Sequence, residues 1–197
     1  MSSTPPRLAM IIGSTRPNRF ADKPAEWLLD HATHRDDFTL ESLDLRDFDL
    51  PLFAELATNL HVPSQDPKVL AWQDAIRPFE GFIFVVAEYN HSVTGALKNA
   101  LDQAYKEWVR KPFSALGYGS TGGARAIEHL RAIAVELQMV PSKFSAHIGG
   151  GEMIKVHPAG GNAPISEIAQ AITPSVDAMF NDVVWWANVL TPAREDA

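Results

Sequence analysis

The fold is decided by the stretch FIFVVAEYNHSVTG, residues 82–95. Its first six residues are all apolar and do not alternate with polar ones. A strand with one face in water alternates apolar with polar residues, whereas a strand that is covered on both faces does not. The run therefore predicts a fully buried strand of a parallel sheet. The polar residues from Glu88 onwards predict a loop that leads into a helix.

Apolar runs and helical patterns alternate along the rest of the chain. Further strands are predicted at residues 8–12, 38–45, 113–118 and within 140–148, where the fifth starts after Pro141. Apolar residues recur at helical spacing in the segments 25–32, 69–79, 97–105, 127–137 and 165–187. Asp66-Pro67 is typical of an N-cap followed by a first-turn proline. Pro174 is expected to kink or interrupt the last helix near Thr173.

Five strands alternating with five helices indicate an α/β domain with a parallel sheet and right-handed crossovers. Segment spacing alone leaves the strand order open. The length of 197 residues, 46% of them hydrophobic, suits one domain with a substantial core. We therefore expect a single domain over residues 1–197, with a flexible N-terminus at 1–6 and a long Gly-rich loop at 149–163.

The composition excludes several classes of protein. The net charge of −7, from 17 basic and 24 acidic residues, argues against a nucleic-acid binder. The chain contains no cysteine, which rules out disulfides, thiolate nucleophiles and cysteine-held iron–sulfur clusters. The seven histidines lack metal-ligand spacing, so no metal site is expected. With no membrane-length apolar run and no apolar leader at the N-terminus, the expected location is the cytoplasm, away from the membrane.

Three chemically unusual loops follow the first, third and fourth predicted strands, where open α/β sheets bind ligands. The first, GSTRPNRFA at 13–21, places hydroxyls, two guanidinium groups and helix amides together, as a phosphate requires. It lacks the Gly-Lys-Ser/Thr of a Walker A loop, so a nucleoside triphosphate with magnesium is not expected. An ordinary polar turn with solvated arginines is the alternative.

The second loop, AEYNHSVTG at 87–95, has residues that suit the edge of a planar ligand. It also suits a capping loop in which Ser92 or Thr94 caps the next helix, and the two interpretations are compatible. Direct acid–base catalysis by Glu88 or His91 is less favoured because no partner group is evident in the sequence.

The third loop, GYGSTGGA at 117–124, contains G-x-G-x-x-G, but after the fourth strand and without the acidic residue that a dinucleotide site requires. Ser120 also lacks the first glycine of a nucleophile elbow, because Tyr118 stands two places before it. The glycines more readily allow close approach of the backbone to a flat ring, and amides at the helix start favour negative charge there.

At these three loops, over roughly residues 8–147, the chain resembles the NAD(P)H-dependent FMN reductase family. The motifs on which the resemblance rests are GSTRPNR at 13–19, EYNHS at 88–92 with GALKNALD at 95–102, and GSTGG at 119–123. Two departures stand out. Ala87 replaces the proline that usually precedes the Glu-Tyr-Asn string, and Arg19 stands where many relatives have a small hydroxyl residue.

The resemblance implies a flavodoxin-like three-layer sandwich, with a five-stranded parallel sheet in the order 2-1-3-4-5 and FMN at the switch point. By position, the residues expected around the phosphate are Ser14, Arg16, Asn18, Arg19, Phe20 and Ala21. Those expected along one edge of the isoalloxazine ring are Ala87, Glu88, Tyr89, Asn90 and His91. Those expected at its pyrimidine side are Ser120, Thr121, Gly122 and Gly123.

The implied activity is hydride transfer from NADPH or NADH to FMN, followed by electron transfer to a small acceptor such as a quinone, an azo compound or free flavin. No catalytic side chain is required, because the flavin carries the chemistry. A non-enzymatic FMN electron carrier with a protein partner is the main alternative, and a regulatory module with weak or no flavin binding is another. Family members are commonly dimers or tetramers, and the helix with Trp185-Trp186 and the segment 149–163 are candidate contacts.

Overall fold

The structure, a computed structural model, describes residues 4–195. Half of the predicted flexible N-terminus, residues 1–3, lies outside that range. Pro6, at its other end, is buried, and its carbonyl oxygen accepts a hydrogen bond of 3.0 Å from the amide of Thr39. This contact joins the start of the chain to the sheet.

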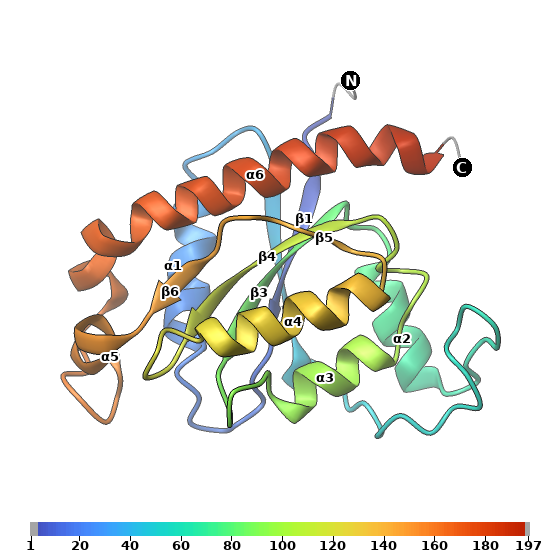
Figure 1. The fold of residues 1–197 in the computed structure, drawn as a ribbon, viewed down its shortest axis with the longest axis horizontal. Coiled ribbons are helices and arrows are strands. Elements are labelled where there is room, and N and C mark those ends of the chain that lie inside the picture. Colours follow the sequence, from blue (N-terminus) through green and yellow to red (C-terminus); the bar gives the residue numbers. More distant parts are fainter. Residues whose placement is uncertain (1–3, 196–197) are drawn as a thin grey trace.

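A parallel sheet forms the centre of the molecule (Figure 1). Its strand order is β2-β1-β3-β4-β5, with β6 also paired to β4, and every pairing is parallel. The strands are β1 (Arg7–Ile12), β2 (Thr39–Asp44), β3 (Gly81–Ala87), β4 (Pro112–Tyr118), β5 (Val140–Pro141) and β6 (Ala146–Ile148). The predicted flavodoxin-like order 2-1-3-4-5 is confirmed.

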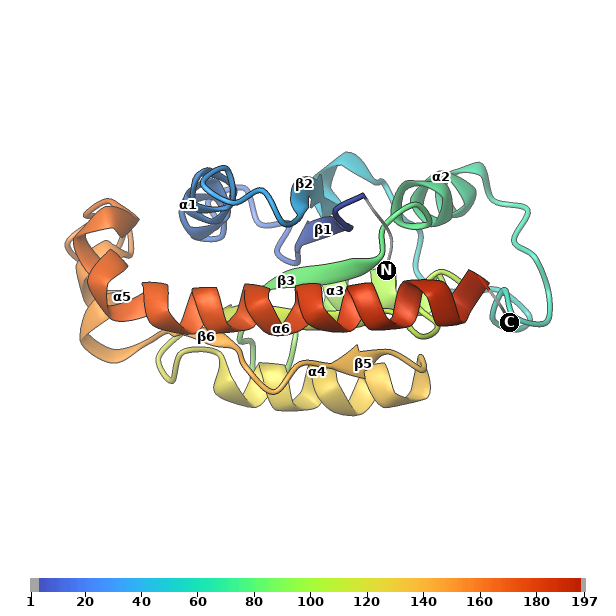
Figure 2. The same ribbon diagram turned by 90° about the horizontal axis from the view of Figure 1, so that it is seen from above.

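Helices cover both faces of this sheet (Figures 1 and 2). On one face lie α1 (Asp22–Ala32), α5 (Gly150–Val156), the 3-10 helix η2 (Ile165–Ile168) and α6 (Ala169–Glu195). On the other lie the 3-10 helix η1 (Leu45–Asp47), α2 (Pro67–Ile76), α3 (Gly95–Asp102) and α4 (Ala124–Glu136). Asp66 caps α2 by accepting from Lys68 N, and Thr94 caps α3 by accepting from Leu97 N.

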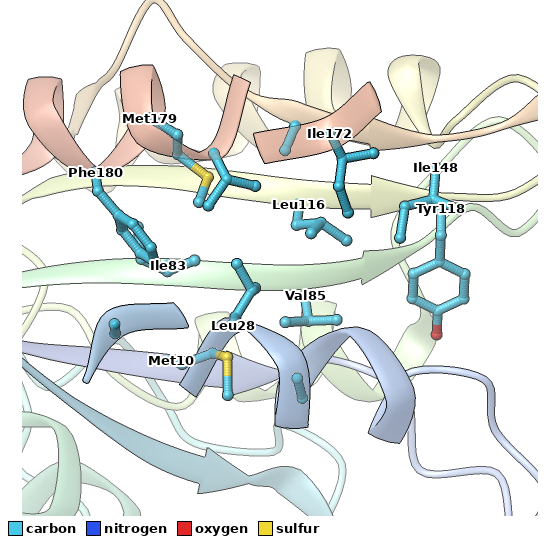
Figure 3. Close-up of a cluster of buried hydrophobic side chains, with 14 of the residues drawn as sticks. Met10, Leu28, Ile83, Val85, Leu116, Tyr118, Ile148, Ile172, Met179 and Phe180 are labelled. Atoms are coloured by element: carbon cyan, nitrogen blue, oxygen red, sulfur yellow. The ribbon is translucent and has the colours of Figure 1, made fainter. Parts of the chain in front are cut away.

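The strand β3 divides its side chains between two cores, as its uninterrupted apolar sequence requires. Ile83 and Val85 join the core under α1 and α6, whereas Phe82 and Phe84 join the core under α2, α3 and α4. All seven residues of β3 are buried. Figure 3 shows the first core, which Tyr118 closes at the carboxyl ends of the strands. The loops that begin there are therefore anchored on rigid strands.

The fifth predicted strand is wrong as a single element, because it is split into β5 and β6. Between them the chain is held by side chains. Ser142 Oγ donates to Asp182 Oδ2 on α6 over 2.6 Å, and Ser114 Oγ donates to the carbonyl oxygen of Phe144 over 2.5 Å. Ser142 N still donates to Phe113 O over 2.8 Å, but Lys143 N donates to Asp182 Oδ2 over 3.2 Å, so the ladder is interrupted after Ser142.

The predicted loop at 149–163 is also partly wrong, since residues 150–156 form α5. Val156 is fully buried in the core below. The ammonium group of Lys23 on α1 donates to the carbonyl oxygens of Val156, Asn162 and Ala163 over 2.9–3.1 Å. Burial and this lysine fix a segment whose glycines suggested a loop.

Pro174 does not interrupt the last helix, because α6 runs from Ala169 to Glu195. Ile172 lies before the proline and Val176 and Met179 after it, and all three are buried in the same core. Packing on both sides of the proline outweighs the one backbone hydrogen bond that it removes. The predicted interruption at Thr173 is therefore wrong. Within residues 4–195, no helix combines the length and hydropathy needed to cross a membrane.

Candidate functional site

The three predicted loops meet at the carboxyl edge of the sheet. The chain leaves β1 for β2 on one side and later enters β3 on the other, so the strand order reverses between β1 and β3. The first loop is held against the second at this point. Gly13 N donates to Val85 O over 3.0 Å, and the hydroxyl of Thr94 donates to Gly13 O.

The first loop ends at the N-terminus of α1. Ala21 occupies the N-cap position and carries no side-chain acceptor. In the first turn Lys23 N donates to Phe20 O and Pro24 has no amide hydrogen, so the amide of Asp22 is the one that faces an anion. Arg16 and Asn18 are exposed in the same loop, and the Arg16 guanidinium lies 5.5 Å from the ring centre of Tyr89. The predicted phosphate residues are thus brought together here, with Phe20 and Ala21 buried behind them.

Arg19 differs from its neighbours in this loop. Its side chain is only 1% exposed and is directed into the protein, toward Asp22 and Asp44. The backbone of Arg19 stays in the loop, but its charge is already paired.

The second loop makes a tight turn. Tyr89 and Ser92 exchange backbone hydrogen bonds of 2.9 and 3.0 Å, and the two residues between them have positive φ values, 50° at Asn90 and 69° at His91. Two left-handed central residues are typical of a type I′ turn. The turn presents Asn90 and His91 at the surface.

The glycines of the third loop are required by the protein itself. A Cβ on Gly117 would lie 2.6 Å from Gly122 O, and a Cβ on Gly123 would lie 2.7 Å from Tyr118 N. Gly122 and Gly123 also have φ values of 68° and 71°, which other residues adopt only with strain. The loop therefore folds tightly onto the end of β4, leaving Ser120 and Thr121 exposed.

An ion pair joins the second loop to the third. Glu88 accepts hydrogen bonds from Arg125 Nε at 2.5 Å and from Arg125 N at 3.1 Å, and its side chain is 5% exposed. Burial alone would raise the pKa of Glu88, but the hydrogen bonds and charge of Arg125 outweigh burial and lower it. Arg125 Nη1 also donates to His91 Nε2 over 2.8 Å. Glu88 is thus held ionised between the loops.

A buried tyrosine lies behind the first and third loops. Burial of Tyr118 raises the pKa of its hydroxyl to about 12, although a hydrogen bond with Ser14 opposes the shift. Ser14 is itself buried, and its hydroxyl lies 3.5 Å from that of Tyr89. The hydroxyl of Tyr118 is therefore neutral at physiological pH and is available only as a hydrogen-bonding group.

Two open cavities flank the loops. One of about 360 Å³ lies beside the first loop and is lined by residues that include Thr15, Arg46 and Asn99. The other, of about 330 Å³, is mainly apolar and lies between Ser120 and α5, with Met153 and His157 in its wall. The site therefore has a polar side and an apolar side.

Comparison with known proteins decides the family. The sequence model of the family described as NADPH-dependent FMN reductase matches residues 6–150, which include all three loops. The chain belongs to the NADPH-dependent FMN reductase family. The expected membership is thereby confirmed.

Two curated relatives and one solved structure illustrate this FMN reductase family likeness. An NAD(P)H-dependent FMN reductase from Nectria sp is 34% identical over 154 residues, 74% of this chain and 77% of that protein. A 2-hydroxy-1,4-benzoquinone reductase from Burkholderia sp is 32% identical over 142 residues, 68% of this chain and 73% of that protein. A flavoenzyme NAD(P)H:(acceptor) oxidoreductase from Paracoccus denitrificans has a TM-score of 0.71 and 25% identity, covering 94% of this chain and 98% of that one.

Sequence reasoning missed residues that hold the loops of this FMN reductase family member in place, chiefly Arg125 and Asp44. Arg125 lies in the first turn of α4, where the helix dipole disfavours a cation. This placement signals a carboxylate partner. Asp44 ends β2, and the order 2-1-3 places that end beside the first loop. Neither position identifies its partner from the sequence alone.

Proposed function

We propose that this chain is an NAD(P)H-dependent FMN oxidoreductase that takes a hydride from NADPH or NADH and passes electrons to a small acceptor. The observation that carries the proposal is the meeting of the three loops at the switch point of the sheet, with the N-terminus of α1 opening into the first loop. Membership of the NADPH-dependent FMN reductase family supports the same activity.

The residues present suit FMN. The first loop offers the exposed side chains of Arg16 and Asn18 to a phosphate at the N-terminal end of α1, whereas the hydroxyl of Ser14 is buried. We assign the flavin ring to the surface formed by 87–91 and 120–123, where Asn90, His91, Ser120 and Thr121 are exposed. Bound FMN would supply the hydride and electron chemistry.

The remaining roles belong to the protein. The pair Glu88–Arg125 holds the second and third loops at a fixed separation. Gly122 and Gly123 lead into α4, whose first-turn amides favour negative charge nearby. Tyr118 stays neutral because of its high pKa, and Glu88 stays ionised because of its low one. We therefore assign no side chain as a general acid or base.

The acceptor we propose is a small electrophile such as a quinone, an azo compound or free flavin. The Burkholderia relative is named a benzoquinone reductase, and a relative from Solanum tuberosum is named an NAD(P)H:quinone oxidoreductase. The mainly apolar cavity beside Ser120 has room for a small aromatic ring. These points favour a quinone among the three.

The test is steady-state oxidation of NADPH and NADH by FMN-loaded protein under anaerobic conditions, with and without benzoquinone. We expect turnover that requires both FMN and the quinone. A protein that binds FMN but oxidises neither nucleotide would instead be an electron carrier. A protein that binds no FMN would be a regulatory module. The reductase names of the relatives favour the enzyme.

We further propose that the protein is a homodimer or homotetramer in the cytoplasm. Trp185 is 58% exposed and Phe144 is 42% exposed, and both line one surface depression. Ile154 of α5 is 69% exposed. Exposed apolar side chains of this size favour a protein interface. A membrane partner and a nucleic-acid partner are not part of the proposal.

A further inference from the structure

The guanidinium of Arg19 is fully occupied by protein acceptors. Arginine carries five N–H groups. Nε donates to Asp22, Nη1 donates to Ser14 O over 2.7 Å and to Asp44 Oδ1 over 2.6 Å, and Nη2 donates to Asp44 Oδ2 over 2.5 Å and to Asp22. Each N–H therefore has an acceptor within the chain, and none is left for a ligand.

The charge of Arg19 is balanced as well. Arg46 lies 3.1 Å from Asp22 and 3.2 Å from Asp44, so the cluster contains two guanidinium groups and two carboxylates. Burial by itself would raise the pKa of Asp44, but hydrogen bonds from Arg19 and Arg46 lower it to about 2. Asp44 is thus ionised at physiological pH, and the cluster pairs two basic with two acidic side chains.

Arg16 is placed in the opposite way. It is exposed at the mouth of the loop over the ring of Tyr89, and within residues 4–195 no acidic side chain forms an ion pair with it. Its charge is available to an anion at the N-terminus of α1.

We propose that Arg19 is a positioning residue that ties Ser14 to the end of β2 through Asp44, while Arg16 supplies the cation for the FMN phosphate. The proposal rests on the proposed FMN binding. It departs from the family resemblance, which implied that the side chain of Arg19 surrounds the phosphate. Arg19 acts before the flavin arrives, by fixing the loop that receives it.

An ordered loop strengthens the binding of both FMN and riboflavin, whereas a phosphate contact strengthens the binding of FMN alone. Removing the Arg19 clamp should therefore lower the affinity for FMN and for riboflavin by the same factor, because both need the ordered loop. Removing Arg16 should lower the affinity for FMN alone. The preference for FMN over riboflavin separates the two roles.

The test uses the charge-neutral double variant Arg19→Met/Asp44→Asn, with Arg16→Gln for comparison. Removing Arg19 alone would leave two carboxylates to one guanidinium, and this excess negative charge would itself weaken FMN binding. Dissociation constants for FMN and riboflavin are measured by quenching of flavin fluorescence on flavin-free protein that is shown to be folded at the working temperature. If the double variant does not fold, Arg19→Lys, which keeps the charge but loses the fork, replaces it.

We expect the double variant to bind both flavins about tenfold more weakly with an unchanged preference, and Arg16→Gln to lose about tenfold or more of the preference. A preference that falls in the double variant as it does in Arg16→Gln would overturn the proposal, as would unchanged affinity for both flavins. Amide exchange at 14–20 in flavin-free protein should also speed up in the double variant, and unchanged exchange would contradict the clamp. Wild-type protein that binds neither flavin would overturn the proposed function, and the exchange measurement would still test the clamp.

Discussion

Glu88 and Arg125 form an ion pair that joins the loop after β3 to the start of α4. The carboxylate is nearly buried, with 5% of its side chain exposed, whereas the guanidinium is 42% exposed. The two charges of this pair are therefore buried to different extents. Removing the arginine leaves a buried charge without its partner, which costs more than removing both members.

We therefore expect Arg125→Met to lower the free energy of unfolding by about 2–3 kcal/mol, and the double variant Glu88→Gln/Arg125→Met to lower it by only about 1 kcal/mol. Because Arg125 lowers the pKa of Glu88, this stabilisation is present above the unfolded-state pKa of glutamate and is lost as the pH falls below it. Urea unfolding measures both effects. Glu128→Gln, which breaks an exposed pair on the same helix, is the control and should change stability by less than about 0.5 kcal/mol. An Arg125→Met variant as stable as the control would refute the role of the pair.

Alanine at Gly123 and alanine at Gly151 should change the stability of the protein differently. A Cβ on Gly123 meets Tyr118 N at 2.7 Å and must adopt a φ of 71°, so Gly123→Ala should destabilise by about 2–4 kcal/mol. A Cβ on Gly151 in α5 meets no atom within 4 Å, so Gly151→Ala should be neutral or stabilise by up to about 1 kcal/mol. Thermal unfolding of the two variants compares them directly, and equal melting temperatures would contradict the tight packing of the third loop.

Lys111 should make stability depend on pH at the alkaline end. Burial, aided by the charge of Arg194, lowers the pKa of its ammonium to about 8. Between that value and its unfolded pKa, the unfolded chain holds the proton and the native protein does not, so stability rises with pH. The free energy of unfolding of wild type, minus that of Lys111→Met, should rise by up to about 3 kcal/mol between pH 7 and 10.5. A pH-independent difference would show that Lys111 titrates normally.

The exposed tryptophan tests the proposed oligomer. Trp185→Glu places a charge on an apolar surface patch without disturbing the core, because the side chain is 58% exposed. We expect the variant to elute as a monomer in size-exclusion chromatography with light scattering, where the wild type is a dimer or tetramer. Val135→Glu, at another exposed apolar position of 67%, is the matched control and should leave the assembly intact. A wild type that is monomeric at micromolar concentration would refute the oligomer.

The strands and most helices were predictable because their signals are local. The apolar run 82–87 requires a strand that is covered on both faces. Asp66 and Pro67 start a helix whatever the tertiary contacts of that segment are. The errors arose where distant packing decides. Lys23 holds the Gly-rich segment against α1, and Asp182 accepts from the amide of Lys143 where a continuous fifth strand would bond to β4.

The candidate site was predictable to the level of its loops but not of its side-chain partners. The spacing of polar motifs after buried strands indicated where a ligand binds, since parallel strands end at one edge. That the side chain of Arg19 turns toward Asp44 depends on a contact across 25 residues, which no local pattern records. The same holds for Glu88 and Arg125, which lie 37 residues apart.

The central claim is that this chain binds FMN and reduces it with a nicotinamide nucleotide. The most direct measurement is an anaerobic absorbance scan of the protein with stoichiometric FMN, before and after addition of NADPH or NADH. The account predicts a bound-flavin spectrum that bleaches within seconds with at least one of the two donors. A bound flavin that stays yellow with both donors, or no bound flavin at all, would contradict it.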